Sequence, residues 1–305
     1  MNSGKPVSLA RKGVSQLVNP FELPGQWYKA NLHAHSTNSD GWLSPQHAIR
    51  TYRNGGFHIL ALTDHWKVTH VRGKPEEGFL YLQGVELDGG RTAVGNYHII
   101  GIGVDAQPER DRLPSAQDQI DWVVAQGGVA FLAHPYWSGL SAEDCLALHA
   151  YAGIELYNTG CELEIARGFS FVHWDDLLSR GRRVSGIGVD DGHRPAFDML
   201  QGWTMIKALD LTEAAVLEAL RNGACYASTG PKILDLQLYE SKIFCTCSPA
   251  RRIALVSNPT RGHVLHARLG ERLTDAEFSL PADCTYVRIQ IEDEHGRMAW
   301  GPPLF

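Results

Sequence analysis

Histidine and carboxylate side chains recur at the ends of short apolar runs in this sequence. Each residue alone is weak evidence, because a single His at the end of a strand is usually solvated or hydrogen-bonded. Together they are costly to bury in one place unless they are paired or bind cations. Neutral imidazole and ionised carboxylate are the forms that bind metals. The candidates are His33, His35, Asp40, Asp64, His65, Glu86, His98, His134, Asp190, Asp191 and His193.

The donor types indicate which metals to expect. None of the 6 cysteines lies in these motifs, which argues against a structural zinc site built on thiolates. Mixed imidazole and carboxylate sets suit Zn, Mn or Fe. These ligands exceed what one tetrahedral ion needs, so we expect two or three divalent ions bridged by carboxylate. Ions about 3.5–4 Å apart share a hydroxide that attacks phosphorus in line with the leaving group.

Short apolar runs supply the strand ends that carry these residues. Each run has four to six residues, mainly β-branched, Leu or aromatic, as is typical of strands buried on both faces. The runs span residues 28–32, 59–63, 80–85, 98–103, 129–133, 154–157, 184–189 and 203–207.

Helices with recognisable ends lie between several of these runs. Ser44 caps a predicted helix that starts at Pro45 and ends at Gly55, and Ser141 with Asp144 predicts a capping box. Strand–helix alternation predicts a parallel sheet that right-handed crossovers close into a barrel. The ends of parallel strands then meet at one rim, where barrel enzymes build their sites.

The sequence pattern changes after Gly230. Alternation with a period of two, as at Leu234, Leu236 and Leu238, predicts antiparallel strands, and the remaining residues suffice for a small β-sandwich. We therefore predict an N-terminal arm at 1–26, a barrel domain at 27–230 and a β-sandwich tail domain at 231–305.

Composition excludes several classes of protein. The 305 residues carry a formal net charge of -6, which argues against long nucleic acid or anionic membrane as a partner. No apolar run reaches the roughly 18 residues of a spanning helix. The first 26 residues lack the apolar core of a secretory signal. The scattered cysteines favour reduced thiols and a cytoplasmic protein.

The order and spacing of the motifs resemble the PHP family, named after polymerase and histidinol phosphatase. The resemblance covers about residues 27–230 and implies a distorted seven-stranded (β/α) barrel with two or three metal ions. Most characterised members hydrolyse phosphoesters. The matching motifs are His33-Ala34-His35 with Asp40-Gly41, Thr63-Asp64-His65, Gly84-Val85-Glu86, His134-Pro135 and Asp191-Gly192-His193.

Further stretches resemble one branch of that family, which has a β-rich tail and includes carbamate hydrolases. The resemblance therefore leaves the type of bond open between phosphoester and carbamate. The stretches are residues 19–22, 134–137, 153–158 and 297–300.

The resemblance implies three overlapping sets of metal ligands. The first set is His33, His35, Glu86 and Asp191, with Glu86 as the bridge. The second set is Asp40, His65 and His193. The third set is Glu86, His98 and His134, where His98 is either a ligand or a hydrogen-bond donor outside the metal shell.

Two further carboxylates have roles that the resemblance does not fix. Asp191 is preferred to Asp190 as the ligand, because the family's aspartate precedes its histidine by two positions. The role of Asp190 stays open. Glu155 is expected at the rim, where hydrogen bonding to a ligand or loop is favoured over direct ligation.

The favoured hypothesis is a metal-dependent phosphoesterase that hydrolyses a small phosphorylated metabolite or nucleotide by attack of a metal-bridging hydroxide. The predicted catalytic residues are Asp64, as a proton relay to the leaving alkoxide, Asp191 and His193. Arg194 and Lys67 are predicted to bind the phosphate. Two alternatives are a carbamate, ester or amide hydrolase with the same site, and a non-catalytic metal-binding or partner-binding module.

Overall fold

The computed structural model describes residues 17–71, 77–258 and 260–305. Residues 1–16 of the predicted arm at 1–26 lie outside the described residues. Within the described part of the arm, Pro20–Glu22 forms a short 3-10 helix that Asn19 caps.

Strands dominate the described part of the chain. They are β1 (Gln26–Asn31), β2 (Ile59–Leu62), β3 (Leu80–Arg91), β4 (Asn96–Ile102), β5 (Val129–Leu132), β6 (Gly153–Asn158), β7 (Ser185–Val189), β8 (Trp203–Ala208), β9 (Cys225–Ser228), β10 (Ile233–Tyr239), β11 (Lys242–Ala250), β12 (Arg252–Ser257), β13 (Gly262–His266), β14 (Leu273–Ser279), β15 (Val287–Glu292) and β16 (Met298–Trp300). The helices are α1 (Pro45–Asn54), α2 (Ala116–Ala125), α3 (Ala142–Leu146), α4 (Thr159–Ile165), α5 (Phe171–Ser179) and α6 (Glu213–Arg221).

The predicted helix ends are confirmed where the capping residues were clear. The side chain of Ser44 accepts from the backbone N–H of His47, and α1 ends before Gly55. Ser141 and Asp144 form the predicted capping box at the start of α3. None of the described helices is both long enough and apolar enough to cross a membrane.

The large sheet is of mixed direction. Its strand order is β13-β12-β15-β16-β9-β8-β1-β2-β3-β4-β5-β6-β7. Strands β1, β2 and β3 are mutually parallel, as are β5, β6 and β7, whereas β4 is antiparallel to both its neighbours. Strand β8 is antiparallel to β1 and β9. The prediction of a uniformly parallel sheet is therefore wrong for the runs at 98–103 and 203–207.

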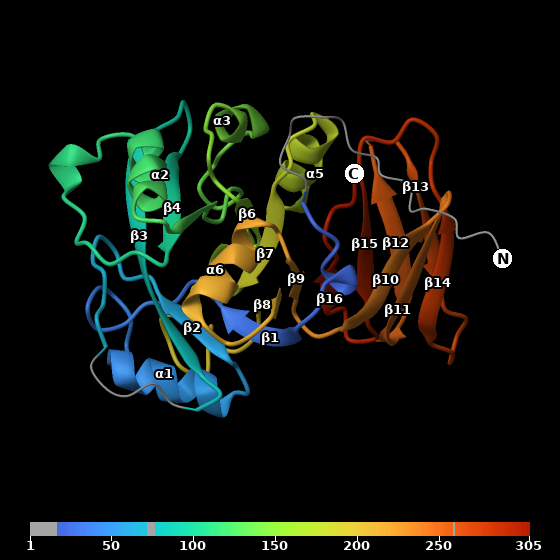
Figure 1. Cartoon of the computed structure of the whole chain (residues 1–305), viewed down its shortest axis with the longest axis horizontal. Coiled ribbons are helices and arrows are strands. Elements are labelled where there is room, and N and C mark those ends of the chain that lie inside the picture. Colours follow the sequence, from blue (N-terminus) through green and yellow to red (C-terminus); the bar gives the residue numbers. More distant parts are fainter. Residues whose placement is uncertain (1–16, 72–76, 259) are drawn as a thin grey trace.

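The predicted barrel does not close by backbone pairing within the described residues. Strand β7 ends the ladder order, although it lies against β9 (Figure 1). The hydroxyl of Thr204 in the interior strand β8 contacts the edge strand β7: it donates to the carbonyl of Gly188 at 2.8 Å and accepts from the Gly188 N–H at 3.1 Å. The fold is thus a mixed α/β structure around a curved, parallel-rich sheet rather than a closed seven-stranded barrel.

Replacing Thr204 with Val tests this link. Thr204 and Gly188 are both buried. Valine has nearly the same shape as threonine but no hydroxyl, so the change leaves the N–H and the carbonyl of Gly188 without this hydrogen-bond partner. We expect the free energy of unfolding to fall by about 1–3 kcal/mol in chemical denaturation. Thr246→Val on the exposed face of β11 is the matched control and should change it by less than about 0.5 kcal/mol. An equal effect of the two changes would contradict the link.

The C-terminal strands continue the large sheet through the ladder between β16 and β9. Strands β10, β11 and β14 form a second antiparallel sheet. Both sheets contribute to one apolar cluster, with Leu236 and Ile243 on one side and Ile253 and Ile289 on the other. Figure 1 shows these two layers together at one end of the molecule. The domain boundaries at 26 and 230 stay a prediction.

A second apolar cluster lies inside the curve of the large sheet. Ile59, Ile100, Phe131 and Ile187 from four different strands belong to it, and Val216 of α6 packs with them. All are buried, so this cluster forms a closely packed apolar layer beside the strand ends that carry the polar residues.

Candidate metal centre

The predicted ligands lie together at one end of the strands of the large sheet. They fall into overlapping groups in which every ligand atom lies within 4.8 Å of the others. Two single backbone bridges bring the carrying loops together, one between Ala34 and Gly192 and the other between His65 and Glu86. The predicted ligands are His33 and His35 after β1, Asp40 before α1, His65 after β2, Glu86 in β3, His98 in β4, His134 after β5, and Asp191 and His193 after β7.

Glu86 lies at the centre of the group, and its carboxylate is almost fully buried. Each of its oxygens faces imidazole nitrogens from several loops. The atoms near Oε2 are Nε2 of His33 at 3.1 Å, Nε2 of His35 at 3.1 Å and Nδ1 of His65 at 3.3 Å. The atoms near Oε1 are Nδ1 of His98 at 2.7 Å and Nε2 of His134 at 3.3 Å. One carboxylate therefore connects the three predicted ligand sets.

Asp191 completes the first ligand set. Its Oδ1 lies 3.1 Å from Nε2 of His33 and 3.2 Å from Nε2 of His35, yet this buried atom accepts no hydrogen bond from the described residues. A buried carboxylate oxygen without a hydrogen-bond donor is costly. A cation between these atoms removes that cost, because it accepts lone pairs from the oxygen and both nitrogens.

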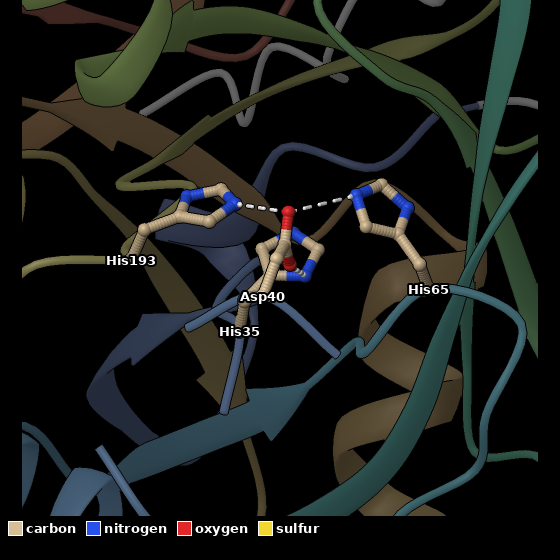
Figure 2. A group of neighbouring side chains, drawn as sticks. All are labelled: His35, Asp40, His65 and His193. Atoms are coloured by element: carbon tan, nitrogen blue, oxygen red, sulfur yellow. Dashed lines mark ion pairs between the residues drawn. The ribbon is translucent and has the colours of Figure 1, made fainter. Parts of the chain in front are cut away.

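The second ligand set surrounds Asp40. His65 and His193 approach its Oδ2 from either side, with Nε2 atoms at 3.6 and 3.4 Å, and His35 lies beside it with Nδ1 3.3 Å from Oδ1 (Figure 2). The side chain of Asp40 is 52% exposed, so this set faces the open side of the centre. His35 touches both sets, which the sequence did not predict.

Hydrogen bonds fix which imidazole nitrogen faces the centre. Nδ1 of His33 donates to Oε1 of Glu155 at 2.6 Å, so Nε2 of the neutral ring directs its lone pair inward. Nδ1 of His193 donates to the backbone carbonyl of Asp191 at 2.8 Å, which leaves its Nε2 facing Asp40. Such outer partners orient metal-binding histidines in general.

The charges of the cluster reinforce one another. Burial alone would lower the pKa of His35, but its contacts with Asp191 and Glu86 raise it to about 9. Burial alone would raise the pKa of Glu86, but His33 and hydrogen bonds from neighbouring imidazoles hold it well below its usual value. The carboxylates stay ionised and attract positive charge, which protons or metal ions can supply. The donor set thus fits divalent Zn, Mn or Fe.

The comparisons with known proteins show a similarity of fold. No protein-family model and no curated protein matches the sequence. A two-domain protein from Bacteroides vulgatus, containing a predicted PHP-like metal-dependent phosphoesterase, has a similar structure. That similarity has a TM-score of 0.51 and 16% identity over 95% of each chain. At the level of fold, the resemblance to the PHP family is confirmed.

Two other solved structures are less similar to this chain. One is an amidohydrolase from Chromobacterium violaceum with bound sulfate and no metal, at a TM-score of 0.42 and 18% identity over 55% of this chain and 89% of the other. The other is a candidate metal-dependent phosphoesterase from Bifidobacterium adolescentis, at a TM-score of 0.44 and 17% identity over 64% of this chain and 96% of the other.

Two predicted ligands have unusual backbone geometry. His134 has φ 26° and Asp191 has φ 53°, both in the left-handed region that non-glycine residues avoid. Gly192 follows without a side chain because a Cβ there would lie 2.5 Å from the hydroxyl of Tyr52. Strain of this kind persists where the surroundings force it and is common at functional sites.

Asp64 is held by a set of donors. It accepts from the Ser36 N–H at 2.7 Å and from the hydroxyls of Ser36, Ser39 and Thr69. Both oxygens are engaged, so this environment favours a role in fixing the loop after β1 over the predicted proton relay.

Asp190 is turned away from the ligand cluster. It accepts from the backbone N–H groups of Leu200, Gln201 and Gly202 and from the hydroxyl of Thr159. Burial raises its pKa to about 6, although these hydrogen bonds oppose the shift. Asp190 therefore holds the segment at 200–202 in place.

The two predicted phosphate contacts differ in their surroundings. The guanidinium of Arg194 pairs with Glu164 at 3.0 Å and Asp198 at 3.5 Å and stacks on the ring of Phe197. Its charge is thus already balanced by carboxylates. Lys67 is exposed on the loop after His65.

Sequence reasoning missed three residues of the centre. Asn158 donates to Glu155 Oε2 at 2.9 Å and to Asp191 Oδ2 at 3.2 Å, so one amide connects two carboxylates. The hydroxyl of Ser138 lies 2.9 Å from Nδ1 of His134. The thiol of Cys161 lies with His134 and Asp191, although the motifs contain no cysteine. Only the stretch at 153–158 gave any signal for these positions.

Glu155→Gln tests the outer layer of the centre. The amide keeps the size of the side chain but replaces one carboxylate oxygen by an NH2 group, which is a donor. That NH2 group faces either Nδ1 of His33 or the two donors near Oε2, which are the amide of Asn158 and the backbone N–H of His134. We expect metal affinity to fall about 10–100-fold, as is usual when an outer partner of a ligating His is lost. Titration of Zn into the metal-free protein measures this. An unchanged affinity would show that Glu155 does not orient His33.

Proposed function

We propose that this chain is a metal-dependent hydrolase, and specifically a phosphoesterase acting on a small phosphorylated metabolite or nucleotide. The observation that carries the proposal is the buried carboxylate of Glu86, which lies within 3.3 Å of five imidazole nitrogens. A structural role alone does not require so many titratable groups around one buried charge. The PHP-like fold supports the same reading.

Two or three divalent ions would be held by the three ligand sets that Glu86 connects. When bound, such ions supply an activated water as nucleophile and neutralise charge on the phosphoryl oxygens. The protein's own residues orient the ligands: Glu155 fixes the tautomer of His33, and Asn158 fixes the carboxylate of Asp191. Of the predicted catalytic residues, Asp191 and His193 lie in the cluster itself.

Substrate binding is proposed to use the open side of the centre. Trp137 is 37% exposed, and its ring packs edge-on against His98 and His134 at centroid distances of 5.7 and 4.9 Å. It shields these imidazoles from water, which strengthens electrostatic interactions at the centre. Lys67 is the proposed contact with the phosphate, because Arg194 must first leave Glu164 and Asp198.

A substrate panel tests the proposal. The purified full-length chain, loaded with Mn or Zn, should release phosphate from at least one small phosphomonoester or phosphodiester. Carbamate, ester and amide substrates belong in the same panel, because the same donor set can activate water toward a carbonyl carbon. Cleavage of these alone would replace the phosphoesterase proposal by the alternative hydrolase. No turnover of any member, with metal bound, would favour a non-catalytic module.

A further inference from the structure

A buried arginine of the C-terminal strands contacts a helix beside the metal centre. Arg288 in β15 is only 2% exposed. Its Nε and Nη2 donate to the two carboxylate oxygens of Asp175 in α5, both at 2.7 Å. The hydroxyl of Tyr286 also donates to Asp175, at 3.0 Å. This two-point contact fixes orientation as well as distance, because the guanidinium and the carboxylate are both planar.

Helix α5 in turn holds the loop that carries His134. The hydroxyl of Ser170, which precedes the helix, accepts from the backbone N–H of Tyr136 at 3.1 Å. Nε2 of His173 in the first turn donates to the carbonyl of Leu140 at 2.8 Å. The loop is therefore held near each of its ends by residues at the start of the same helix.

The geometry of this loop decides where the imidazole of His134 lies. Its backbone has φ 26°, a conformation that the surrounding structure has to impose. Inside the loop, Leu140 donates to the carbonyl of Pro135 at 3.0 Å, and the hydroxyl of Ser138 contacts Nδ1 of His134. A shift of the loop moves Nε2 away from its position 3.3 Å from Glu86.

A second contact from the C-terminal strands acts on the same helix start. Trp300 in β16 is fully buried and stacks on Tyr157, with ring centroids 6.0 Å apart. It also packs against Phe169, the residue before Ser170, at 6.1 Å. Both ends of the segment at 169–175 are thus in contact with the C-terminal strands.

We propose that the C-terminal strands position the metal ligand His134 through α5, with Arg288 and Asp175 as the positioning pair. Buried ion pairs add little to stability compared with apolar residues of the same size, so positioning is the better account of this one. The inference rests on the proposed function, because it takes His134 as a metal ligand. It assigns the positioning of that ligand to residues far from it in the sequence. It gives the C-terminal strands a part in the chemistry of the centre.

The test compares Zn binding by full-length variants with that by the wild-type chain. Arg288→Met should weaken the binding of one ion about 10–100-fold and change the visible spectrum of the cobalt-loaded protein, which reports ligand geometry. Arg288→Lys keeps the charge without the planar fork and should give an intermediate affinity. Lys242→Met, which removes an exposed pair with Glu277 on β11, is the matched control and should leave both readouts unchanged.

Several outcomes decide the inference. Wild-type affinity and an unaltered cobalt spectrum in Arg288→Met would overturn it, even if thermal stability falls. If Arg288→Met does not fold, Asp175→Asn takes its place, because that side chain is 26% exposed and tolerates the change. Wild-type protein that binds metal but hydrolyses no phosphoester would defeat the proposed function alone. Wild-type protein that binds less than one metal per chain would defeat both.

Discussion

Glu86→Gln is expected to empty the centre of metal and to lower turnover by about a thousandfold or more. The amide has no charge to balance the imidazole-bound cations, and its nitrogen is a donor among groups that must offer lone pairs. A catalytic metal supplies several kcal/mol of transition-state stabilisation, and each 1.36 kcal/mol is tenfold in rate. Because Glu86 touches members of all three ligand sets, no other single change should remove as much metal.

Asp88→Asn is the matched control for that variant. Asp88 lies on the same strand, and its carboxylate is partly exposed and pairs with Arg110 at 3.0 Å. The metal content and turnover of the Asp88→Asn variant should equal those of the wild type. Circular dichroism would show that both variants are folded. A Glu86→Gln protein with full metal content would contradict the central role of this carboxylate.

Asp191→Ala and Asp190→Ala should have different effects, although the residues are adjacent. The first should lower turnover and metal content, and the second should lower the stability of the fold. Asp191 carries a buried oxygen that accepts no hydrogen bond from the described residues, and it is a member of the first predicted ligand set. Its removal should abolish turnover and lower the metal content, while the metal-free chain keeps its melting temperature. Asp190 accepts three backbone N–H groups, and losing it should cost about 1–3 kcal/mol for each donor left buried.

Elemental analysis and thermal unfolding of the two variants check this pair of expectations. Asp190→Ala should unfold at a lower temperature and still bind metal when folded, because its carboxylate does not face the cluster. The assignment of the ligand to Asp191 would be wrong if Asp190→Ala lost metal and Asp191→Ala kept it.

Most of the predicted ligands could be located from the sequence because they follow a strand, whereas Glu86 and His98 lie within β3 and β4. The local pattern of apolar residues indicates where a strand ends, and the pairing of the strands in the sheet then brings these ends together. His35 in two ligand sets was not predictable, because its ring orientation depends on Asp40, which lies in a turn. Asn158 and Cys161 were missed for a similar reason: the end of β6 and the first turn of α4 place this amide and this thiol near Asp191, and the local sequence does not show that proximity.

The direction of β4 was predicted wrongly for a reason visible in the chain. A parallel connection needs a crossover of a dozen or more residues, whereas β3 and β4 are joined directly, with Arg91 paired to Asn96. The hairpin was overlooked because the apolar run alone does not report direction. The predicted closure of the barrel was wrong because β7 has no backbone ladder with β8, and the side chain of Thr204 supplies the hydrogen bonds between these two strands.

The ion-pair partners of Arg194 could not be read from its place in the sequence. It follows His193 directly, which suggested a phosphate contact. In the fold it pairs with Glu164, 30 residues away on α4. Long-range ion pairs of this kind have no trace in a local motif.

The metal content of the purified full-length chain tests the central claim most directly. Elemental analysis after expression in medium supplied with Zn, Mn and Fe should find two or three of these ions per chain, because three connected ligand sets share Glu86. Glu86→Gln, prepared in parallel, should hold fewer. Less than one ion per chain in the wild type, after such loading, would contradict the account of this site as a metal centre.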